Sequence, residues 1–142
     1  MCGIIGILSD QPAAPRLVEA LKRLEYRGYD SAGVALLEAG KLKRLRAPGK
    51  LNNLDEKVRG LPLKAGVGIG HTRWATHGGP TDSNAHPHVS QDRRVAVIHN
   101  GIIENFAELR AELQAKGRVF ASETDSEVVA HLLDEHLNEG MA

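Results

Sequence analysis

The sequence predicts a mixed domain in which strands and helices alternate and pack in layers. Its 142 residues suit one domain and can bury a sizeable core. Short apolar runs, typical of strands, alternate with segments whose apolar residues recur every three or four positions, as in helices. Two strand segments, 34–38 and 41–46, are joined by Ala39-Gly40, which predicts a hairpin. The hairpin argues against a purely parallel sheet.

The first half of the chain contains the other elements that flank this hairpin. An apolar run predicts a strand over 3–8, and leucine and valine at helical spacing predict a helix over 15–26. A short helix is expected over 51–58. The next strand, 65–71, has glycines at alternate positions, so another backbone or a ligand can approach one face closely. The segment 72–91 has no regular periodicity, and loops of that length commonly serve a function.

The second half of the chain is predicted to alternate in the same way. Apolar residues predict a buried strand over 95–99 and a short strand over 119–121. Capping-box patterns at 105–108 and 124–127 each predict the start of a helix. Gly117 is expected to end the first of these two helices.

Charge and composition exclude several classes of partner. The 18 basic and 18 acidic residues balance, so neither a nucleic acid nor an anionic membrane is expected to bind. The longest basic cluster, 41–46, alternates with leucine and fits a strand with one solvated face. No run approaches the roughly 20 apolar residues of a membrane span, and the N-terminus does not resemble a signal peptide. A single cysteine fits a reducing cytoplasm.

Cys2 is this only cysteine, and it directly follows the start methionine. Met1 is commonly removed ahead of a small residue, which would place the thiol beside a free α-amine. The pKa of such an amine is about 7.7–8.0 in peptides. One residue would then hold both a nucleophile and its general base. The alternative is a small hydrophobic residue that opens a buried strand, and position alone does not decide between them.

An N-terminal nucleophile that attacks a carboxamide needs further groups. It requires hydrogen-bond donors for the oxyanion, and Asn100 with the backbone N–H of Gly101 supplies them at a strand end. An amino-acid substrate also needs a cation for its carboxylate and an anion for its amine. Arg73 is the candidate for bidentate binding of the carboxylate, and Asp125, at a helix start, for the ammonium.

Seven histidines raise two other possibilities. His86 and His88 lie near several other histidines in the sequence, but the ligand spacings of zinc sites are absent, so no metal is predicted. The second possibility is a conventional dyad, in which His77 or His99 acts as the base for Cys2.

Six motifs, in order along the chain, resemble one family. They are MCGI at 1–4, LEYRGYDSAG at 24–33, HTRWATHG at 71–78, NAHPH at 84–88, HNGIIEN at 99–105 and SETD at 122–125. The chain resembles the class II, N-terminal-nucleophile glutamine amidotransferases, from Cys2 to about His131. The second and third motifs resemble the glutaminase domain of glutamine–fructose-6-phosphate aminotransferases, also called glucosamine-6-phosphate synthases. The purine-pathway and asparagine-synthesising branches carry different residues in those loops.

The resemblance implies an α+β fold, an α-β-β-α sandwich of two antiparallel sheets that is incomplete at its C-terminus here. It implies that Cys2 attacks the glutamine side-chain amide with its own α-amine as base, which leaves a γ-glutamyl thioester. Asn100 and the Gly101 N–H would form the oxyanion hole. No metal or organic cofactor is implied for this half-reaction.

The resemblance also assigns the residues that surround the substrate. Arg73 would bind the glutamine α-carboxylate and Asp125 the α-amine. The other expected contacts are Thr76 and His77, which would line the glutamine loop, Trp74, which would gate the passage of ammonia, and Arg27, which would orient the N-terminal residue.

The same resemblance extends to the longer protein. Residues 1–142 are expected to be the N-terminal part of a glutamine amidotransferase type 2 domain, without the isomerase domains that bind fructose 6-phosphate. L-glutamine is the expected substrate, and the full-length protein is expected to be a homodimer. The alternative is a non-catalytic fragment of the same fold that binds glutamine or a partner subunit.

Overall fold

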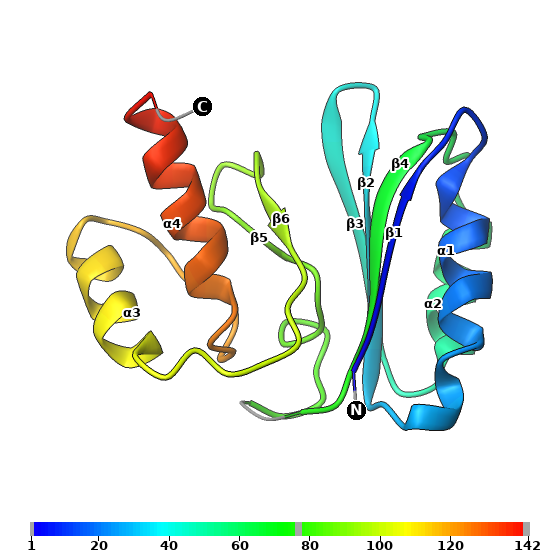
Figure 1. The fold of residues 1–142 in the computed structure, drawn as a ribbon, viewed down its shortest axis with the longest axis horizontal. Coiled ribbons are helices and arrows are strands. Elements are labelled where there is room, and N and C mark those ends of the chain that lie inside the picture. Colours follow the sequence, from blue (N-terminus) through cyan, green and yellow to red (C-terminus); the bar gives the residue numbers. More distant parts are fainter. Residues whose placement is uncertain (1, 76–77, 141–142) are drawn as a thin grey trace.

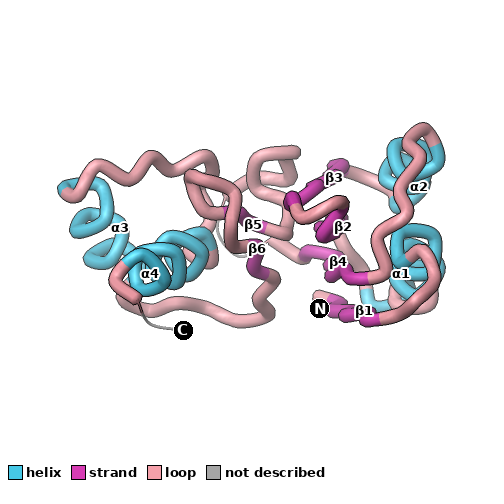
Figure 2. The backbone as a smooth tube through the Cα atoms, turned by 90° about the horizontal axis from the view of Figure 1, so that it is seen from above, coloured by secondary structure: helices cyan, strands magenta, loops and turns pink. Residues whose placement is uncertain are grey.

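The computed structural model describes residues 2–75 and 78–140. Its elements form layers in the order helix, sheet, sheet, helix, as Figures 1 and 2 show from two directions. A large antiparallel sheet lies beside the first helical layer, and a small two-stranded ladder separates it from the second helical layer. None of the described helices is long and apolar enough to cross a membrane.

The large sheet has four strands, all antiparallel. Their spatial order is β1 (Gly3–Leu8), β4 (Val67–Arg73), β2 (Ser31–Glu38) and β3 (Lys41–Pro48). The predicted hairpin is confirmed as β2 and β3, although β2 begins three residues earlier than expected. Ala39 and Gly40 have φ values of 49° and 78°, the positive values that a tight two-residue hairpin turn requires.

The first helical layer consists of α1 (Ala13–Lys22) and α2 (Leu51–Arg59), packed on one face of the large sheet. The alternating glycines of β4 lie on this face. A Cβ on Gly68 would lie 2.8 Å from the side chains of Leu17 and Leu36, so bare backbone lets α1 pack closely. The close approach predicted along β4 is therefore made by a helix of the same chain.

Helix α1 ends four residues before its predicted end at 26. The N–H groups of Arg23 and Leu24 bond to carbonyls three residues back, which tightens the last turn. A separate 3₁₀ turn, η1 (Glu25–Arg27), follows, and Gly28 ends it with a φ of 77°. Only a residue that tolerates positive φ can turn the chain there, which explains the glycine.

The small ladder consists of β5 (His88–Val89) and β6 (Ala96–Val97), so the strand predicted over 95–99 forms over two residues only. It is half-buried rather than buried, which corrects the prediction. The strand predicted over 119–121 does not form. The Val119 N–H donates to the Gln91 side chain and the Ala121 N–H to the Glu127 carboxylate, so neither is free to pair with a strand.

The second helical layer consists of α3 (Phe106–Ala115) and α4 (Glu127–Asn138). Both helices were predicted, but neither has the predicted capping box: the N-cap residues, Asn105 and Ser126, make no side-chain capping hydrogen bond. The Glu127 carboxylate instead accepts hydrogen bonds from the N–H groups of Ala121 and Ser122. Glu127 therefore stabilises the loop before α4 rather than the N-terminus of the helix.

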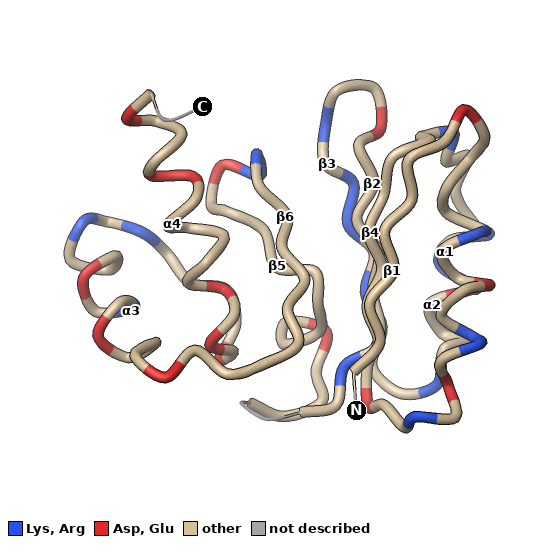
Figure 3. Tube along the Cα trace, viewed as in Figure 1, with Lys and Arg blue, Asp and Glu red and all other residues tan. Residues whose placement is uncertain are grey.

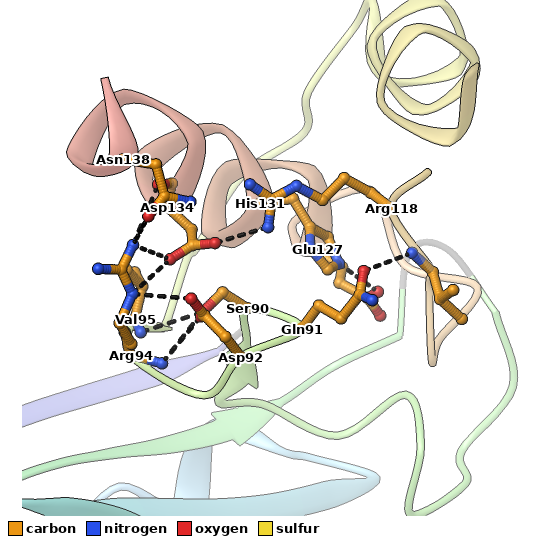
Figure 4. A network of polar contacts seen from close by, with 11 residues as sticks. Ser90, Gln91, Asp92, Arg94, Val95, Arg118, Glu127, His131, Asp134 and Asn138 are labelled. Atoms are coloured by element: carbon orange, nitrogen blue, oxygen red, sulfur yellow. Dashed lines mark hydrogen bonds and ion pairs between the residues drawn. The ribbon is translucent and has the colours of Figure 1, made fainter. Parts of the chain in front are cut away.

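A charged network joins α4 to the loop between β5 and β6 (Figure 4). Asp134 is fully buried, and its carboxylate lies 2.8 Å from Arg94 Nη2 and 2.6 Å from Arg118 Nη1. The Arg94 Nη2 also bonds to the Asn138 side chain. The two guanidinium groups hold Asp134 in place, because without them its buried negative charge would be unpaired.

Figure 3 marks the basic residues along β3. Because successive side chains alternate between the faces of a strand, Lys41 and Lys43 lie on one face and Arg44 and Arg46 on the other, rather than all sharing one solvated face. Lys41 and Lys43 are exposed. Arg46 Nη1 donates to the carbonyls of Ser83 and Ala85, and Arg44 Nη1 to the carbonyl of Pro87. Burial lowers the pKa of Arg44 to about 10, which still leaves it charged at neutral pH. These arginines hold the loop before β5 against the large sheet.

Gly33→Ala is expected to lower the free energy of unfolding by about 1–3 kcal/mol, because overpacking forces the backbone to shift. A Cβ at Gly33 would collide with the carbonyl oxygen of His86, in the loop that crosses β2. Gly6→Ala is the matched control, since a Cβ there meets no atom within 4 Å. Urea unfolding followed by circular dichroism measures both variants. Equal stabilities would contradict the close crossing of β2 by this loop.

Candidate active site

Cys2 directly precedes β1, an edge strand of the large sheet, and lies beside the end of β4. The β1–β4 register pairs Gly3 with Thr72, and the Gly3 N–H donates to Thr72 Oγ1 at 3.0 Å. This register places Cys2 beside Trp74, whose backbone N–H donates to Cys2 Sγ at 3.1 Å. The thiol in turn approaches the Trp74 carbonyl at 3.7 Å. The sulfur is therefore held at the sheet end, half-buried, rather than packed inside a strand.

Asn100 reaches Cys2 from the opposite layer. Its Nδ2 donates to the Cys2 carbonyl at 3.2 Å, although the two residues are 98 positions apart in the sequence. Its Oδ1 lies 2.9 Å from His71 Nε2 on β4. Gly101 follows, and a Cβ there would lie 2.9 Å from His99 Nε2, so a larger residue has no space. Of the two predicted oxyanion donors, Asn100 thus contacts the backbone of the predicted nucleophile, and Gly101 lines the same cavity as Cys2.

A cavity of about 260 Å³ opens between the layers at this point. Five of the predicted site residues line it: Cys2, Arg73, Trp74, Gly101 and Asp125. Its other lining residues are His86, His99, Ile102, Thr124 and Ser126. A pocket of this kind, with charged groups of both signs beside a thiol, suits a small zwitterionic substrate.

Arg73 connects this cavity to the loop that follows β4. Its side chain is buried, with 3% exposed, and its guanidinium donates to the carbonyls of Gly79 and Gly78 at 3.0 and 3.2 Å. Asp30 Oδ1 lies 3.9 Å from Nη1. The guanidinium therefore shapes the loop and also presents positive charge to the cavity.

Asp125 supplies the opposite charge. Its Oδ2 accepts a hydrogen bond from the Ile103 N–H at 2.6 Å, and among the described residues Oδ1 makes one long contact, 3.4 Å, with the Ser126 hydroxyl. A carboxylate has about four acceptor sites, so Asp125 keeps capacity for an ammonium group. It is buried beside the cavity, as its predicted role requires.

The motif at 24–33 supports the site from outside the cavity. Asp30 accepts a hydrogen bond from the Ala75 N–H at 2.5 Å, and its own N–H donates to the Arg73 carbonyl at 2.7 Å. The Tyr29 hydroxyl accepts from the Leu51 N–H and donates to Glu25. These contacts fix where the chain leaves β4.

The remaining predicted contacts are less defined. The Trp74 side chain is 55% exposed, and its ring lies over Gly28, where a Cβ would be 3.1 Å from a ring carbon. Arg27 ends η1 and is half-buried, and its role in orienting the N-terminal residue stays a prediction. Thr76 and His77 lie outside the described residues.

Four histidines cluster at the cavity: His71, His86 and His88 are buried, His99 is half-buried, and His86 and His99 line the cavity. The rings of His71 and His86 stack at 4.1 Å between centroids, and His88 meets His86 edge-on at 4.5 Å. His99 Nδ1 contacts the Ser126 hydroxyl at 3.1 Å, and its backbone N–H donates to His86 Nδ1. In the described part of the chain, His99 is thus bonded to Ser126 rather than to Cys2, which disfavours the dyad with His99 as base.

Burial controls the charge of these histidines. Desolvation lowers the pKa of His71 to about 4 and that of His88 to about 3, and it lowers the pKa of His86 further. All three are therefore neutral at pH 7. Among the described residues, no group of three or more potential ligands could hold a metal ion.

Sequence reasoning did not assign roles to several of the lining residues. His86, Ile102 and Thr124 lie inside motifs that were recognised, so the motifs themselves were the available signal. Ser126 directly follows the SETD motif and had no signal of its own. His71 opens the HTRWATHG motif and had no assigned role.

The fold and this site define a class of protein. A family profile described as glutamine amidotransferase domain matches residues 49–141, and the chain belongs to that family. The predicted resemblance to the glutaminase part of glutamine–fructose-6-phosphate aminotransferases is confirmed by curated relatives. The protein of that name from Brucella abortus biovar 1 is 64% identical over 140 residues, and that from Gluconobacter oxydans is 63% identical over 142. Each match covers 99% of this chain, which spans 23% of the length of each relative.

Solved structures support the fold. The glutamine phosphoribosylpyrophosphate amidotransferase of B. subtilis, in complex with ADP and GMP, superimposes with a TM-score of 0.76 at 27% identity. A structure titled as the allosteric regulatory enzyme of purine biosynthesis gives a TM-score of 0.78, also at 27% identity. Both matches cover 94% of this chain and 29% of the other. The expected N-terminal-nucleophile sandwich is thereby confirmed.

The neutral histidines predict acid sensitivity. Because His71 has a lower pKa in the folded chain than in the unfolded chain, the unfolded state binds more protons between about pH 6.5 and 4. The free energy of unfolding is therefore expected to fall as pH drops through this window, by about 1.4 kcal/mol per pH unit for each such histidine at most. Below about pH 4 the loss due to His71 stops.

Urea unfolding at pH 7, 6 and 5 measures this dependence. The exposed His136 lies outside this buried group, so His136→Gln controls for the loss of a histidine as such. A free energy of unfolding that stays constant from pH 7 to 5 would show that the buried histidines are not held neutral.

Proposed function

We propose that this chain hydrolyses the side-chain amide of L-glutamine, with Cys2 as nucleophile, and supplies the ammonia to a fructose-6-phosphate aminotransferase. The observation that carries this proposal is the convergence of Cys2, Arg73, Gly101 and Asp125 on one cavity, with Asn100 bonded to the Cys2 backbone. These groups match, in type and in charge, the needs of amide hydrolysis at an amino-acid side chain.

The chemistry begins with removal of Met1, which frees the α-amine of Cys2. The amine takes the thiol proton, and the thiolate attacks the carboxamide carbon of glutamine. The resulting oxyanion is stabilised by the Asn100 side-chain NH₂ and the Gly101 backbone N–H. The ammonium then protonates the leaving nitrogen, so ammonia departs and a thioester remains. Water, deprotonated by the same amine, releases glutamate and restores the thiol.

Substrate binding rests on charge complementarity. Arg73 is proposed to bind the α-carboxylate and Asp125 the α-ammonium, because these opposite charges both border the cavity. Thr76 and His77 are proposed to complete the loop over glutamine. Trp74 is proposed to gate the passage of ammonia, and its exposure beside the cavity fits a gating side chain.

The reaction of the whole protein is also a proposal, because the chain spans only 23% of its curated relatives. We propose that residues 1–142 form the N-terminal part of a glutamine amidotransferase type 2 domain. Domains outside this chain would bind fructose 6-phosphate and use the ammonia, in a cytoplasmic homodimer. The half-reaction assigned here requires no metal or organic cofactor and no nucleic acid.

Cys2→Ala is expected to reduce glutamate production from glutamine by about three orders of magnitude or more, since nucleophile removal has effects of this size or larger. Glutamine binding, measured by calorimetry, should largely persist, because Arg73 and Asp125 are unchanged. Unchanged turnover would disprove the nucleophile assignment. Binding without turnover in the unmutated, Met1-free chain would favour the non-catalytic alternative.

Met1 retention is expected to abolish turnover, because an amide nitrogen replaces the basic amine at Cys2. The test is a chain with an N-terminal extension that a protease removes directly before Cys2. Intact-mass spectra before and after a glutamine-mimicking electrophile should show one adduct on the cleaved chain and none on the uncleaved chain. Comparable turnover by both forms would contradict the role of the α-amine.

A further inference from the structure

The direction of the Asn100 amide decides whether it stabilises or repels an oxyanion. Its NH₂ end faces Cys2 and donates to the Cys2 carbonyl at 3.2 Å, while its Oδ1 end faces His71. A rotation of the amide by 180° would exchange these ends and place a carbonyl oxygen beside the nucleophile. Something must therefore hold the amide in one direction.

The tautomer of His71 provides that control. Its Nε2 lies 3.3 Å from the backbone carbonyl of His99, and a carbonyl oxygen can only accept a hydrogen bond. The Nε2 atom therefore carries the proton. The atom of Asn100 that lies 2.9 Å from the same nitrogen must then be an acceptor, which identifies it as Oδ1 and directs the NH₂ toward Cys2.

The surroundings of His71 keep this tautomer in place. The side chain is fully buried, and its Nδ1 has no hydrogen-bond partner among the described residues. A proton on Nδ1 would be buried without an acceptor, which is costly. The stacked ring of His86, at an interplanar angle of 17°, restricts rotation of the His71 ring. Desolvation also lowers the pKa of His71 to about 4, so the ring stays neutral at working pH.

We propose that His71 is a positioning residue, which directs the Asn100 NH₂ toward the oxyanion through its Nε2–H. The inference rests on the proposed function, in which Asn100 donates to that oxyanion. The buried His71 ring contacts Asn100 and the His99 carbonyl, so it acts through Asn100 and not on the substrate.

Two variants of His71 separate this role from simple packing. His71→Leu removes the donor, and kcat for glutamine hydrolysis should fall by about 10²-fold with KM little changed, which approaches the loss of one oxyanion donor. His71→Gln keeps an N–H donor four bonds from Cα, as in histidine, and should recover most of kcat. Equal kcat for His71→Leu and the unmutated chain would overturn the proposal.

The reactivity of Cys2 provides the second readout. Alkylation of the only cysteine by iodoacetamide forms no oxyanion, so its rate should be nearly the same in His71→Leu and in the unmutated chain. His131→Leu is the matched control, because His131 is equally buried but bonds to Glu127 on α4. It should lose stability without losing kcat. A parallel loss of alkylation and turnover in His71→Leu would indicate a disrupted site and contradict positioning.

A double-mutant cycle tests whether the effect runs through Asn100. Because both changes remove one interaction, His71→Leu should cost little kcat in an Asn100→Ala background. Additive losses in the double variant would show that His71 acts elsewhere.

Nitrogen NMR of the imidazole tests the inference independently of turnover. The expected result is a neutral ring with the proton on Nε2 of His71 from pH 5 to 8. A proton on Nδ1 would overturn the inference even if glutamine is hydrolysed. An unmutated, Met1-free chain that does not hydrolyse glutamine would instead refute the proposed function. The NMR result would then still decide whether His71 directs the NH₂ end of Asn100 toward Cys2.

Discussion

The antiparallel pairing of β1 with β4 is the constraint on which the rest of the site depends. Its register sets Gly3 opposite Thr72, so that Cys2 emerges beside Trp74 at the sheet end. Side chains alternate between the faces of a strand. A slip of β1 by one residue would therefore turn Cys2 to the face of the sheet opposite His71. Burial of β4 against α1, through its bare glycines, specifies this register.

The second constraint is the attachment of the outer layer to this sheet. Arg46 bonds to the loop before β5, and the Gly33 backbone leaves room for the same loop. On the far side, the buried Asp134 joins α4 to the loop after β5. These contacts bring Asn100 and Asp125 over the end of β4. The cavity therefore lies between layers, where no single element could build it.

Much of the local structure was predictable, and the failures share one physical cause. The hairpin at Ala39-Gly40 and the glycine-lined strand were found because turn chemistry and periodicity are local. The capping box at 124–127 failed because Glu127 bonds to backbone N–H groups of the preceding loop. The strand at 119–121 failed because its N–H groups bond to side chains from other segments. In each case a partner outside the expected helix or strand, five to 28 residues away, replaced the partner expected within it.

The sequence by itself determined the family motifs and supplied the candidates for the nucleophile, the oxyanion hole and the substrate charges, because residue identity carries chemistry. Only the tertiary structure decided that Arg73 also holds its own loop and that His71 faces Asn100. The physical reason is sequence distance: Cys2 and Asn100 are 98 positions apart. Strand register and layer packing set the separation of such groups, and no local pattern contains either.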